Sequence, residues 1–256
     1  MNTIAMKFFR VLVRYLIKKK KIDLLEQYEH EILIELGRGW GAETYKEEVQ
    51  LVKSQIQKMN LETMVIFDIG ANIGKYSAEL CRNFPESRII AFEPNPNSYH
   101  ELIKLKDSFQ NIEAFNFGVS RESGRQALYA PDVGSPLSSV DNKNPNYKKI
   151  EIDVISLADF CRTNNFIPNV IKIDVEGHEF QVLLGAEKIL EDIRLIQFEF
   201  GPTNIHSRIF LKDIWDYLTP KGFQLNIMTK SGLLEVSKYR EIYESFRTTN
   251  YLAIRN

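Results

Sequence analysis

Short apolar runs alternate with amphipathic segments from Met64 to the end of the chain. The apolar runs are rich in Ile, Val and Phe and are bounded by Gly, Pro or Asn, which predicts β-strands. The predicted strands cover residues 65–70, 88–94, 112–120, 170–174, 195–200, 222–228 and 251–254. Between them, apolar residues recur at three- and four-residue steps, which predicts helices over 73–84, 97–109, 156–161, 179–189, 210–218 and 239–246. Such alternation is typical of a doubly wound α/β sheet.

One stretch, residues 124–155, departs from this alternation. Short strands predicted at 126–129 and 149–154 flank a loop rich in Pro, Gly, Ser and Asn, with the sequence APDVGSPLSSVDNKNPNY. Loops of this length inside compact domains commonly serve as lids or binding loops. We therefore expect a lid-like insertion over a cofactor and acceptor site.

The N-terminal segment carries basic residues at helical spacing. On a helix over residues 4–22, apolar side chains fill most of the surface and one face is basic, with Lys7, Arg10, Arg14, Lys18 and Lys21. Arginines interrupt the apolar run, so we expect neither a membrane span nor a cleaved signal peptide. The pattern predicts peripheral contact with an anionic membrane; docking on the enzyme body or on a second subunit is the alternative.

Composition agrees with one α/β domain and an appendage. The chain has 256 residues, 44% of them hydrophobic. Cys81 and Cys161 fall in helical patterns, so we expect buried thiols and a reducing compartment. Together with the basic N-terminal helix, this predicts a cytoplasmic protein, peripheral at the inner face of the membrane. The net charge of −1 divides into +7 over the first 21 residues, which hold seven Lys and Arg and no acid, and −8 over the rest. Without a basic run interleaved with aromatics in the body, we expect no nucleic acid partner.

The sequence VIFDIGANIG, residues 65–74, places a tight glycine turn directly after a strand. Glycines let backbone approach a ligand, and the start of the following helix offers free N–H groups, so the turn predicts a cofactor site. The next strand ends in Glu93, about 20 residues past the turn, where a ribose-binding carboxylate is expected. A dinucleotide fingerprint would need glycine in place of Asn72 and again in place of Lys75. The pattern therefore favours a nucleoside that carries an amino acid, S-adenosylmethionine.

Four motifs, DIGANIG, AFEPNP, IKIDVEGHE and IQFEF, resemble in their order and spacing the FkbM-type family of S-adenosylmethionine-dependent methyltransferases. The resemblance spans residues 64–200. It implies a class I methyltransferase (Rossmann-like) doubly wound sheet, mostly parallel with an antiparallel C-terminal strand. It also implies O-methylation of a hydroxyl on a sugar, glycan or lipid-linked saccharide. Two alternatives remain open, a nicotinamide-dependent oxidoreductase on a similar sheet and a non-catalytic cofactor-binding partner protein.

The resemblance also assigns residues to the cofactor. It implies that the first motif surrounds the methionine part, through Asp68, Gly70, Asn72 and Gly74. It implies that Glu93 takes both ribose hydroxyls, for which the two oxygens of a carboxylate are suited. The adenine ring would be bordered by Pro94, Asn95 and Asn116. Asn116 has an equally simple alternative, as a residue that completes a turn.

The junction IKIDVEGHE predicts the acceptor side of the site. Asp174 ends a buried strand, where a carboxylate without a partner or function is costly, so we expect it to face the cofactor and the transferred methyl group. A hydroxyl acceptor must lose its proton. His178 is our first choice of general base because the ordinary pKa of histidine lies near neutrality, and Asp174 and Glu199 compete for that role. His178 can equally be a helix-start residue that bonds the backbone.

Metal binding is a further alternative at this junction. Asp174, Glu176 and His178 could supply oxygen and nitrogen ligands to Mg²⁺, but their spacing is not diagnostic, and we assign no metal ligand.

These patterns divide the chain into three parts. Residues 1–22 form a basic amphipathic helix, residues 23–60 a helical cap, and residues 61–256 the methyltransferase domain with its insertion 124–155. The sequence does not determine the oligomeric state.

Overall fold

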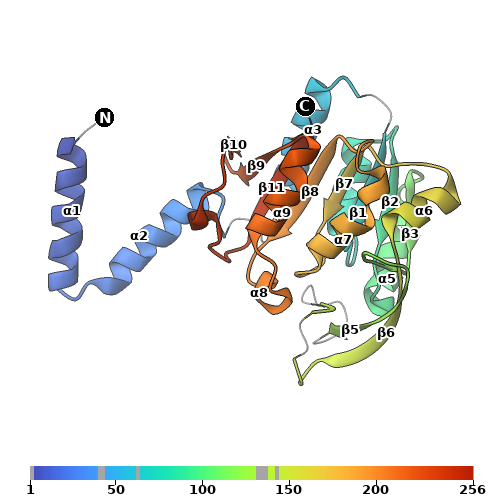
Figure 1. Ribbon diagram of the computed structural model, residues 1–256, viewed down its shortest axis with the longest axis horizontal. Coiled ribbons are helices and arrows are strands. Elements are labelled where there is room, and N and C mark those ends of the chain that lie inside the picture. Colours follow the sequence, from blue (N-terminus) through green and yellow to red (C-terminus); the bar gives the residue numbers. More distant parts are fainter. Residues whose placement is uncertain (1–2, 40–43, 62–63, 131–137, 142–143, 256) are drawn as a thin grey trace.

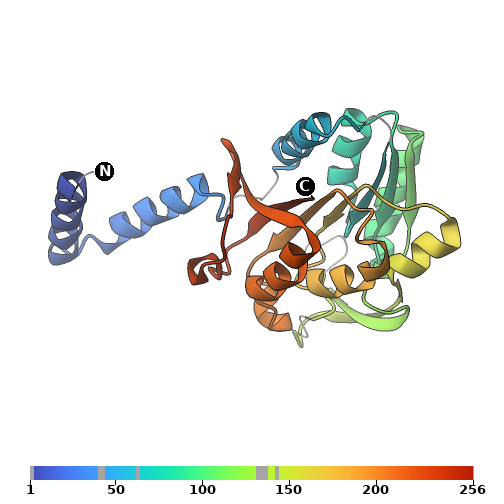
Figure 2. The same ribbon diagram turned by 45° about the horizontal axis from the view of Figure 1, so that its top comes forward.

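The computed structural model describes residues 3–39, 44–61, 64–130, 138–141 and 144–255, apart from the side chains of residues 3–5. Helices cover both faces of an eight-stranded sheet, and the two N-terminal helices form an arm that projects from this body (Figure 1, Figure 2). Within these ranges, no helix is both long and apolar enough to cross a membrane.

The main sheet has the strand order β10-β9-β11-β8-β7-β1-β2-β3. Its strands are β1 (Val65–Ile69), β2 (Arg88–Phe92), β3 (Ile112–Phe115), β7 (Val170–Ile173), β8 (Leu195–Phe200), β9 (Phe223–Thr229), β10 (Gly232–Glu235) and β11 (Thr249–Arg255). The helices are α1 (Thr3–Lys18), α2 (Ile22–Glu35), α3 (Tyr45–Lys58), α4 (Lys75–Asn83), α5 (Pro96–Leu102), α6 (Leu157–Asn164), α7 (Glu179–Gly185), α8 (Asn204–Ser207) and α9 (Leu211–Leu218).

The pairing of the strands confirms the predicted fold class. β3, β2, β1, β7 and β8 are parallel neighbours, whereas β11 runs antiparallel between β8 and β9. From β1 the sheet extends to β2 on one side and to β7 on the other. In open α/β sheets, a crevice forms outside the carboxyl ends of the strands at such a switch point. Gly70 and Asp174, which follow β1 and β7, therefore lie at this crevice.

Side chains alternate along each strand and so divide the core between two faces. Ile66 and Phe67 are neighbours on β1 and both are fully buried, but they belong to separate hydrophobic clusters. The cluster of Ile66 includes side chains of α3, α4 and α5, and that of Phe67 includes side chains of α6, α7 and α9. Because both faces are covered, the central strands are almost continuously apolar, as parallel strands usually are.

Phe160 of α6 stands at the centre of an aromatic cluster on the second of these faces. It makes edge-to-face contacts, at ring-centroid distances of 4.8 to 5.9 Å, with Phe67, Phe92, Phe115 and Phe166. This orientation is favourable because the positive edge of one ring meets the negative face of another. The helix begins where the sequence predicts it, since Ser156 Oγ accepts a hydrogen bond from the backbone N–H of Asp159 at 3.1 Å.

The stretch 124–155 builds most of a second sheet, with the order β4-β6-β5, from β4 (Gly118–Val119), β5 (Gly124–Ala130) and β6 (Lys148–Ile155). Residues 131–137 and 142–143 of the predicted lid lie outside the described residues. The single strand predicted over 112–120 is wrong. The Asn116 side chain donates to the backbone oxygens of Glu93 (2.8 Å) and Pro94 (3.1 Å), and the chain leaves the main sheet there, so that β4 pairs with β6 instead.

Other predicted boundaries also differ from the structure. The helix predicted over 4–22 ends at Lys18, because Lys20 adopts a left-handed φ of +54° before α2 begins at Ile22. The helix predicted over 239–246 is a single 3-10 turn, Glu241–Tyr243, and strand β10 has no counterpart in the prediction. Of the two helices in the predicted cap, α3 buries apolar residues on the sheet, whereas α2 has no buried residue.

The position of Phe160 generates a stability prediction. Phe160→Ala removes a ring that is 2% exposed, and we expect it to lower the free energy of unfolding by about 3 to 5 kcal/mol in a urea titration. Phe8→Ala, at a ring that is 73% exposed, is the control and should change it by less than about 0.5 kcal/mol. Equal, small effects of both changes would contradict the assigned core.

Candidate active site

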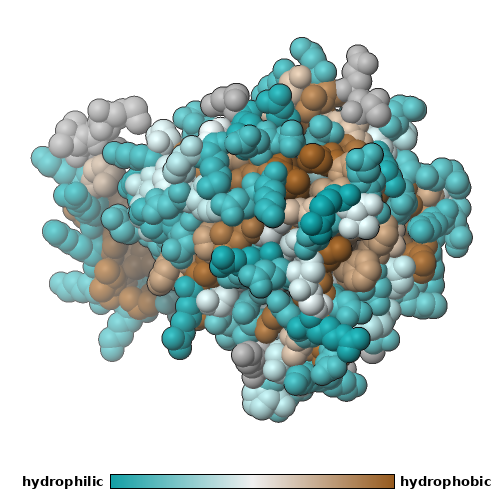
Figure 3. Space-filling model, turned by 45° about the vertical axis from the view of Figure 1, so that its right-hand side comes forward, coloured by the Kyte–Doolittle hydropathy of each residue, from teal (hydrophilic) through white to brown (hydrophobic). Residues whose placement is uncertain are grey.

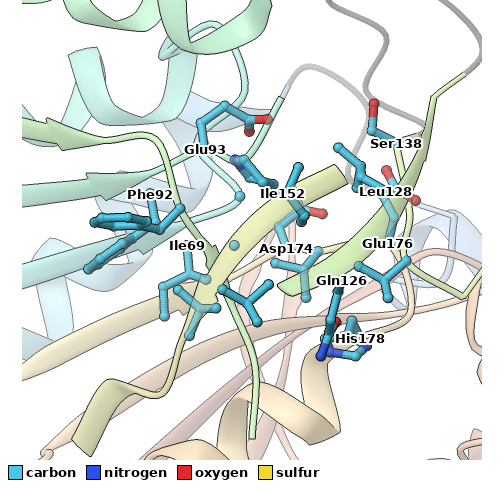
Figure 4. A pocket seen from close by; sticks show the side chains of 18 of the residues that line it. Ile69, Phe92, Glu93, Gln126, Leu128, Ser138, Ile152, Asp174, Glu176 and His178 are labelled. Atoms are coloured by element: carbon cyan, nitrogen blue, oxygen red, sulfur yellow. The ribbon is translucent and has the colours of Figure 1, made fainter. Parts of the chain in front are cut away.

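A pocket lies at the carboxyl ends of β1, β2 and β7, and the second sheet contributes to its wall (Figure 4). Figure 4 shows Glu93 on one side of the pocket and Glu176 and His178 on the other, with Asp174 and Ile152 between them. The switch point of the sheet and the insertion therefore build one site together.

The glycine turn owes its geometry to close packing between backbones. Gly70 has a φ of +81°, and a Cβ at this position would lie 1.8 Å from the backbone oxygen of Asp174. Asn72 is also left-handed, with a φ of +50°, a conformation that asparagine tolerates better than most residues. Gly74, at a φ of +86°, begins α4, and a Cβ there would meet Leu105 Cδ1 at 2.6 Å. Gly70 and Asn72 line the pocket.

Glu93 is buried at the end of β2, and its two carboxylate oxygens bond different segments. Oε2 accepts the backbone N–H of Asn72 at 2.8 Å, and Oε1 accepts that of Asn95 at 2.8 Å. Burial raises the pKa of Glu93 to about 7, although both N–H groups act to lower it. Each oxygen keeps a lone pair, so the carboxylate can still accept two hydroxyl groups from a ligand.

Two acceptor atoms in the pocket wall lack a hydrogen-bond partner among the described residues. They are Asn72 Oδ1 and Gln126 Oε1, and both atoms are buried. A buried polar atom without a partner is costly and calls for an explanation. A ligand with hydrogen-bond donors would satisfy both.

Beneath the pocket, Lys172 joins the carboxylates of neighbouring strands. Its Nζ lies 3.3 Å from Asp68 Oδ1 and 3.3 Å from Asp174 Oδ2. Burial lowers the pKa of Lys172, but the charges of Asp174, Asp68 and Glu48 outweigh this effect and raise it overall, so the amine stays protonated. Asp68 is fully buried, and Ser77 Oγ donates to its second oxygen at 2.6 Å.

Carboxylates gather where β7 and β8 end. Burial, followed by the charges of Asp174 and Glu179, raises the pKa of Glu176 to about 9. Burial, with Asp174 and Glu176 as the next causes, raises the pKa of Glu199 well above its usual range. Glu179 instead closes the loop, because its Oε1 accepts the N–H groups of Val175 and Gly177, both at 3.1 Å. Crowded acids of this kind are typical of functional sites.

His178 is buried, and both of its ring nitrogens have partners. Nδ1 lies 2.8 Å from Asp141 Oδ2, and Nε2 lies 2.9 Å from Ser120 Oγ. An ionised carboxylate can only accept, so Nδ1 carries the proton and Nε2 offers its lone pair to the Ser120 hydroxyl. Gln126 donates to Ser120 Oγ in turn, at 3.1 Å. A second bond from the insertion, Ser139 Oγ to the backbone oxygen of Glu176 at 2.7 Å, holds the same loop.

The Mg²⁺ alternative is not supported by this arrangement. Among the described residues, no group of three or more His, Cys, Asp or Glu side chains is placed to hold a metal ion. The His178 nitrogens, which the alternative requires as ligands beside Asp174 and Glu176, are bonded to Asp141 and Ser120.

A family model described as the methyltransferase FkbM domain matches residues 68–225, which include the glycine turn, Glu93 and the Asp174 to His178 loop. The chain belongs to the FkbM methyltransferase family. It is therefore an S-adenosylmethionine-dependent methyltransferase, and the nicotinamide alternative has no support. The pocket of this FkbM enzyme fits the cofactor, because the ammonium, ribose hydroxyl and adenine amino groups of S-adenosylmethionine are donors of the kind that Asn72 Oδ1 and Gln126 Oε1 lack.

Several named proteins are similar to this FkbM enzyme. Methyltransferase 1 of Beauveria bassiana is 31% identical over 144 residues, which are 48% of this chain and 58% of that protein. Hexuronic acid methyltransferase AglP of Haloferax volcanii is 27% identical over 183 residues, 70% of this chain and 71% of that protein. The 2-O-methyltransferase NoeI of Sinorhizobium fredii is 21% identical over 195 residues, 66% of this chain and 80% of that protein. Magnesium protoporphyrin IX methyltransferase of Synechocystis, solved with bound S-adenosylmethionine, is 13% identical with a TM-score of 0.46, covering 82% and 79% of the two chains.

The predicted site residues fall into two groups in the FkbM enzyme. Those that line the pocket are Gly70, Asn72, Glu93, Pro94, Asp174, Glu176 and His178. Those that do not are Asp68, Gly74, Asn95, Asn116 and Glu199. Two members of the second group bond the first, because the Asn95 N–H donates to the Glu93 carboxylate and the Asn116 side chain donates to the backbone oxygens of Glu93 and Pro94. Direct contact of all five with the cofactor or acceptor stays a prediction.

The residues of the site that were not predicted from the sequence include the polar residues Ser120, Gln126, Asp141 and Lys172. Lys172 interrupts an apolar strand, and this lone polar residue was the one available signal. Ser120, which follows β4, and Gln126 and Asp141 of the insertion meet His178 or the pocket only through the packing of the second sheet on the main sheet.

The environment of Glu93 generates a binding prediction. Ribose hydroxyls bond the ionised carboxylate best, so binding should lower the pKa of Glu93 and release a proton. The affinity for S-adenosylhomocysteine should therefore rise with pH, by up to about tenfold per unit, and level off above the pKa of about 7.

Calorimetric titration from pH 5.5 to 8.5 measures this dependence. Glu93→Gln should weaken binding roughly 10- to 100-fold and flatten the profile, since an amide cannot accept at both oxygen positions. Glu113→Gln, at an exposed glutamate paired with Arg88, is the matched control. An unchanged affinity in Glu93→Gln would remove the ribose role.

Proposed function

We propose that this enzyme transfers the methyl group of S-adenosylmethionine to a hydroxyl of a sugar or glycan. The observation that carries this proposal is the Asp141–His178–Ser120 chain, which orients the imidazole of His178 in the pocket wall and places the lone pair of its Nε2 on the Ser120 hydroxyl. A hydroxyl acceptor needs such a base, because it must lose its proton on methylation. The similarity to AglP and NoeI, which are named for hexuronic acid and 2-O-methylation, supports a sugar acceptor.

The cofactor side of the site would consist of the glycine turn and Glu93. When bound, S-adenosylmethionine supplies an electrophilic methyl group on a sulfonium. Glu93 would hold the ribose hydroxyls, while Asn72 and Gln126 would accept hydrogen bonds from the ligands. The apolar side chains of Leu128, Ile152 and Val154, which the second sheet contributes, would exclude water from the pocket.

His178 would act as the general base. Its Nε2 would accept the acceptor hydroxyl proton in place of the Ser120 proton that it accepts in this structure. Asp141 would stabilise the resulting imidazolium and keep the ring oriented, and a positioned base of this kind contributes about 10² to 10⁴-fold in rate. Asp174, whose side chain is 36% exposed at the pocket, would orient the hydroxyl. Glu199 is less suited as the base because it does not line the pocket.

A transfer assay tests the proposal. The full-length protein, S-adenosylmethionine labelled in the methyl group and extracted glycans should yield a labelled saccharide in mass spectrometry. Glu93→Gln should abolish the product at low cofactor concentration. If the protein binds S-adenosylhomocysteine but labels no saccharide, the sugar acceptor is wrong. If it neither binds nor labels, the non-catalytic alternative would also lose its basis, since that alternative retains the cofactor.

The bonds of His178 generate a kinetic prediction. We expect His178→Asn to lower kcat by about 10² to 10⁴-fold, and Asp141→Asn by a smaller factor because the ring loses its orientation but keeps its lone pair. Both variants should bind S-adenosylhomocysteine like wild type, which separates a catalytic from a structural role.

Asp153→Asn is the matched control, because Asp153 is an exposed aspartate in the same insertion, paired with Arg125. It should leave kcat unchanged. If His178→Asn raises KM and lowers the thermal stability but leaves kcat unchanged, the histidine only holds the insertion in place.

A further inference from the structure

The arm formed by α1 and α2 is rooted in the body and then leaves it. Gly39 N–H donates to the backbone oxygen of Thr248 at 2.6 Å. The side chain of Arg38 is 7% exposed and lies over the ring of Tyr243, 5.4 Å from its centroid. Beyond this root, α2 has no buried residue and α1 stands clear of the body in both views (Figure 1, Figure 2).

Apolar side chains cover most of α1. Phe8 is 73% exposed, and six further large apolar side chains are more than half exposed, namely Met6, Phe9, Val11, Leu12, Tyr15 and Ile17. At about 100° per residue, they occupy roughly two thirds of the circumference of the helix. Figure 3 shows this apolar surface at the left-hand end of the molecule. Exposed apolar surface gathered in this way marks an interaction site.

The rest of the circumference of α1 is a narrow cationic strip, formed by Lys7, Arg10, Arg14 and Lys18. Three further lysines follow at 19–21, and no acid occurs from residue 3 to residue 21. A wide apolar face beside a Lys- and Arg-rich strip is the composition of helices that lie in a membrane interface.

Helix α2 has the opposite charge. It holds five carboxylates and neither lysine nor arginine, with Asp23, Glu26, Glu29, Glu31 and Glu35. An anionic surface would attract α1 and repel α2. The two helices are therefore suited to different places, α1 at the surface and α2 between the surface and the body.

We propose that α1 lies in the surface of an anionic membrane, with its apolar face in the acyl boundary and its basic strip among the headgroups, while α2 spaces the catalytic body from the lipid. The helix has 16 residues, fewer than the roughly 20 that a span requires.

A second copy of the chain fits α1 less well. A partner helix covers a stripe of about 100°, whereas Phe8 and Ile17 lie on opposite sides of α1, and two copies of α1 would also bring like charges together. This inference does not depend on the identity of the acceptor.

Vesicle sedimentation tests the proposal on the full-length protein. Wild type should sediment with vesicles of phosphatidylglycerol and phosphatidylcholine in equal parts, and much less with pure phosphatidylcholine. Replacing Lys7, Arg10, Arg14 and Lys18 together by Gln should weaken partitioning by about fivefold per charge. Phe8→Ser combined with Leu12→Ser should weaken partitioning to both kinds of vesicle. The matched control removes four exposed lysines of the body, Lys104, Lys106, Lys188 and Lys212, and should bind like wild type.

Each variant is also titrated with S-adenosylhomocysteine. Because α1 is remote from the pocket, every variant should bind this ligand like wild type, which verifies that the body is folded. This control also keeps a failure of the membrane proposal distinct from a failure of the proposed function. Wild type that stays in the supernatant with anionic vesicles would overturn the proposal, as would equal binding of the charge variant and the body control. A lipid-free dimer that Phe8→Ser with Leu12→Ser converts to a monomer would also overturn it, since α1 would then be covered by a second copy.

Discussion

The active site depends on one buried cation. Lys172 contacts Asp68 on β1 and Asp174 beyond β7, each at 3.3 Å, and so joins the two strands between which the crevice lies. Buried charges are tolerated when they are paired. Lys172 offsets the charges of Asp68 and Asp174 where Gly70 packs against the backbone of Asp174. Without this cation, two unpaired carboxylates would lie next to a region where burial and neighbouring acids already raise the pKa values of Glu176 and Glu199.

The insertion completes the site with the same contacts that fix its own position. Ser139 and Asp141 bond the loop that carries Glu176 and His178, while the apolar residues of the second sheet cover the pocket. The same insertion therefore both orients the imidazole of His178 and covers the pocket. If His178 is the base, as proposed, it would lose little freedom on catalysis, which is the advantage of a positioned group over one free in solution.

The central sheet could be predicted from the sequence because β1, β2, β7 and β8 are short, mostly apolar runs, each followed by a polar residue or a glycine. The same pattern marked Glu93 and Asp174, since strand ends at a switch point are where ligands bind. The partners of His178 could not be predicted, because Ser120 and Asp141 lie 58 and 37 residues from it in sequence and meet it only through tertiary folding. The break after β3 was missed because Asn116 turns the chain by bonding backbone, which no periodicity records.

The transferred methyl group itself provides the most direct test of hydroxyl methylation. After reaction with S-adenosylmethionine carrying a ¹³C methyl group, long-range carbon–proton NMR of the purified product should connect the methyl protons to a ring carbon of a sugar through an ether oxygen. A connection to a carboxyl carbon, or to a carbon that bears nitrogen, would contradict the assignment of a hydroxyl acceptor and with it the role of His178 as its base.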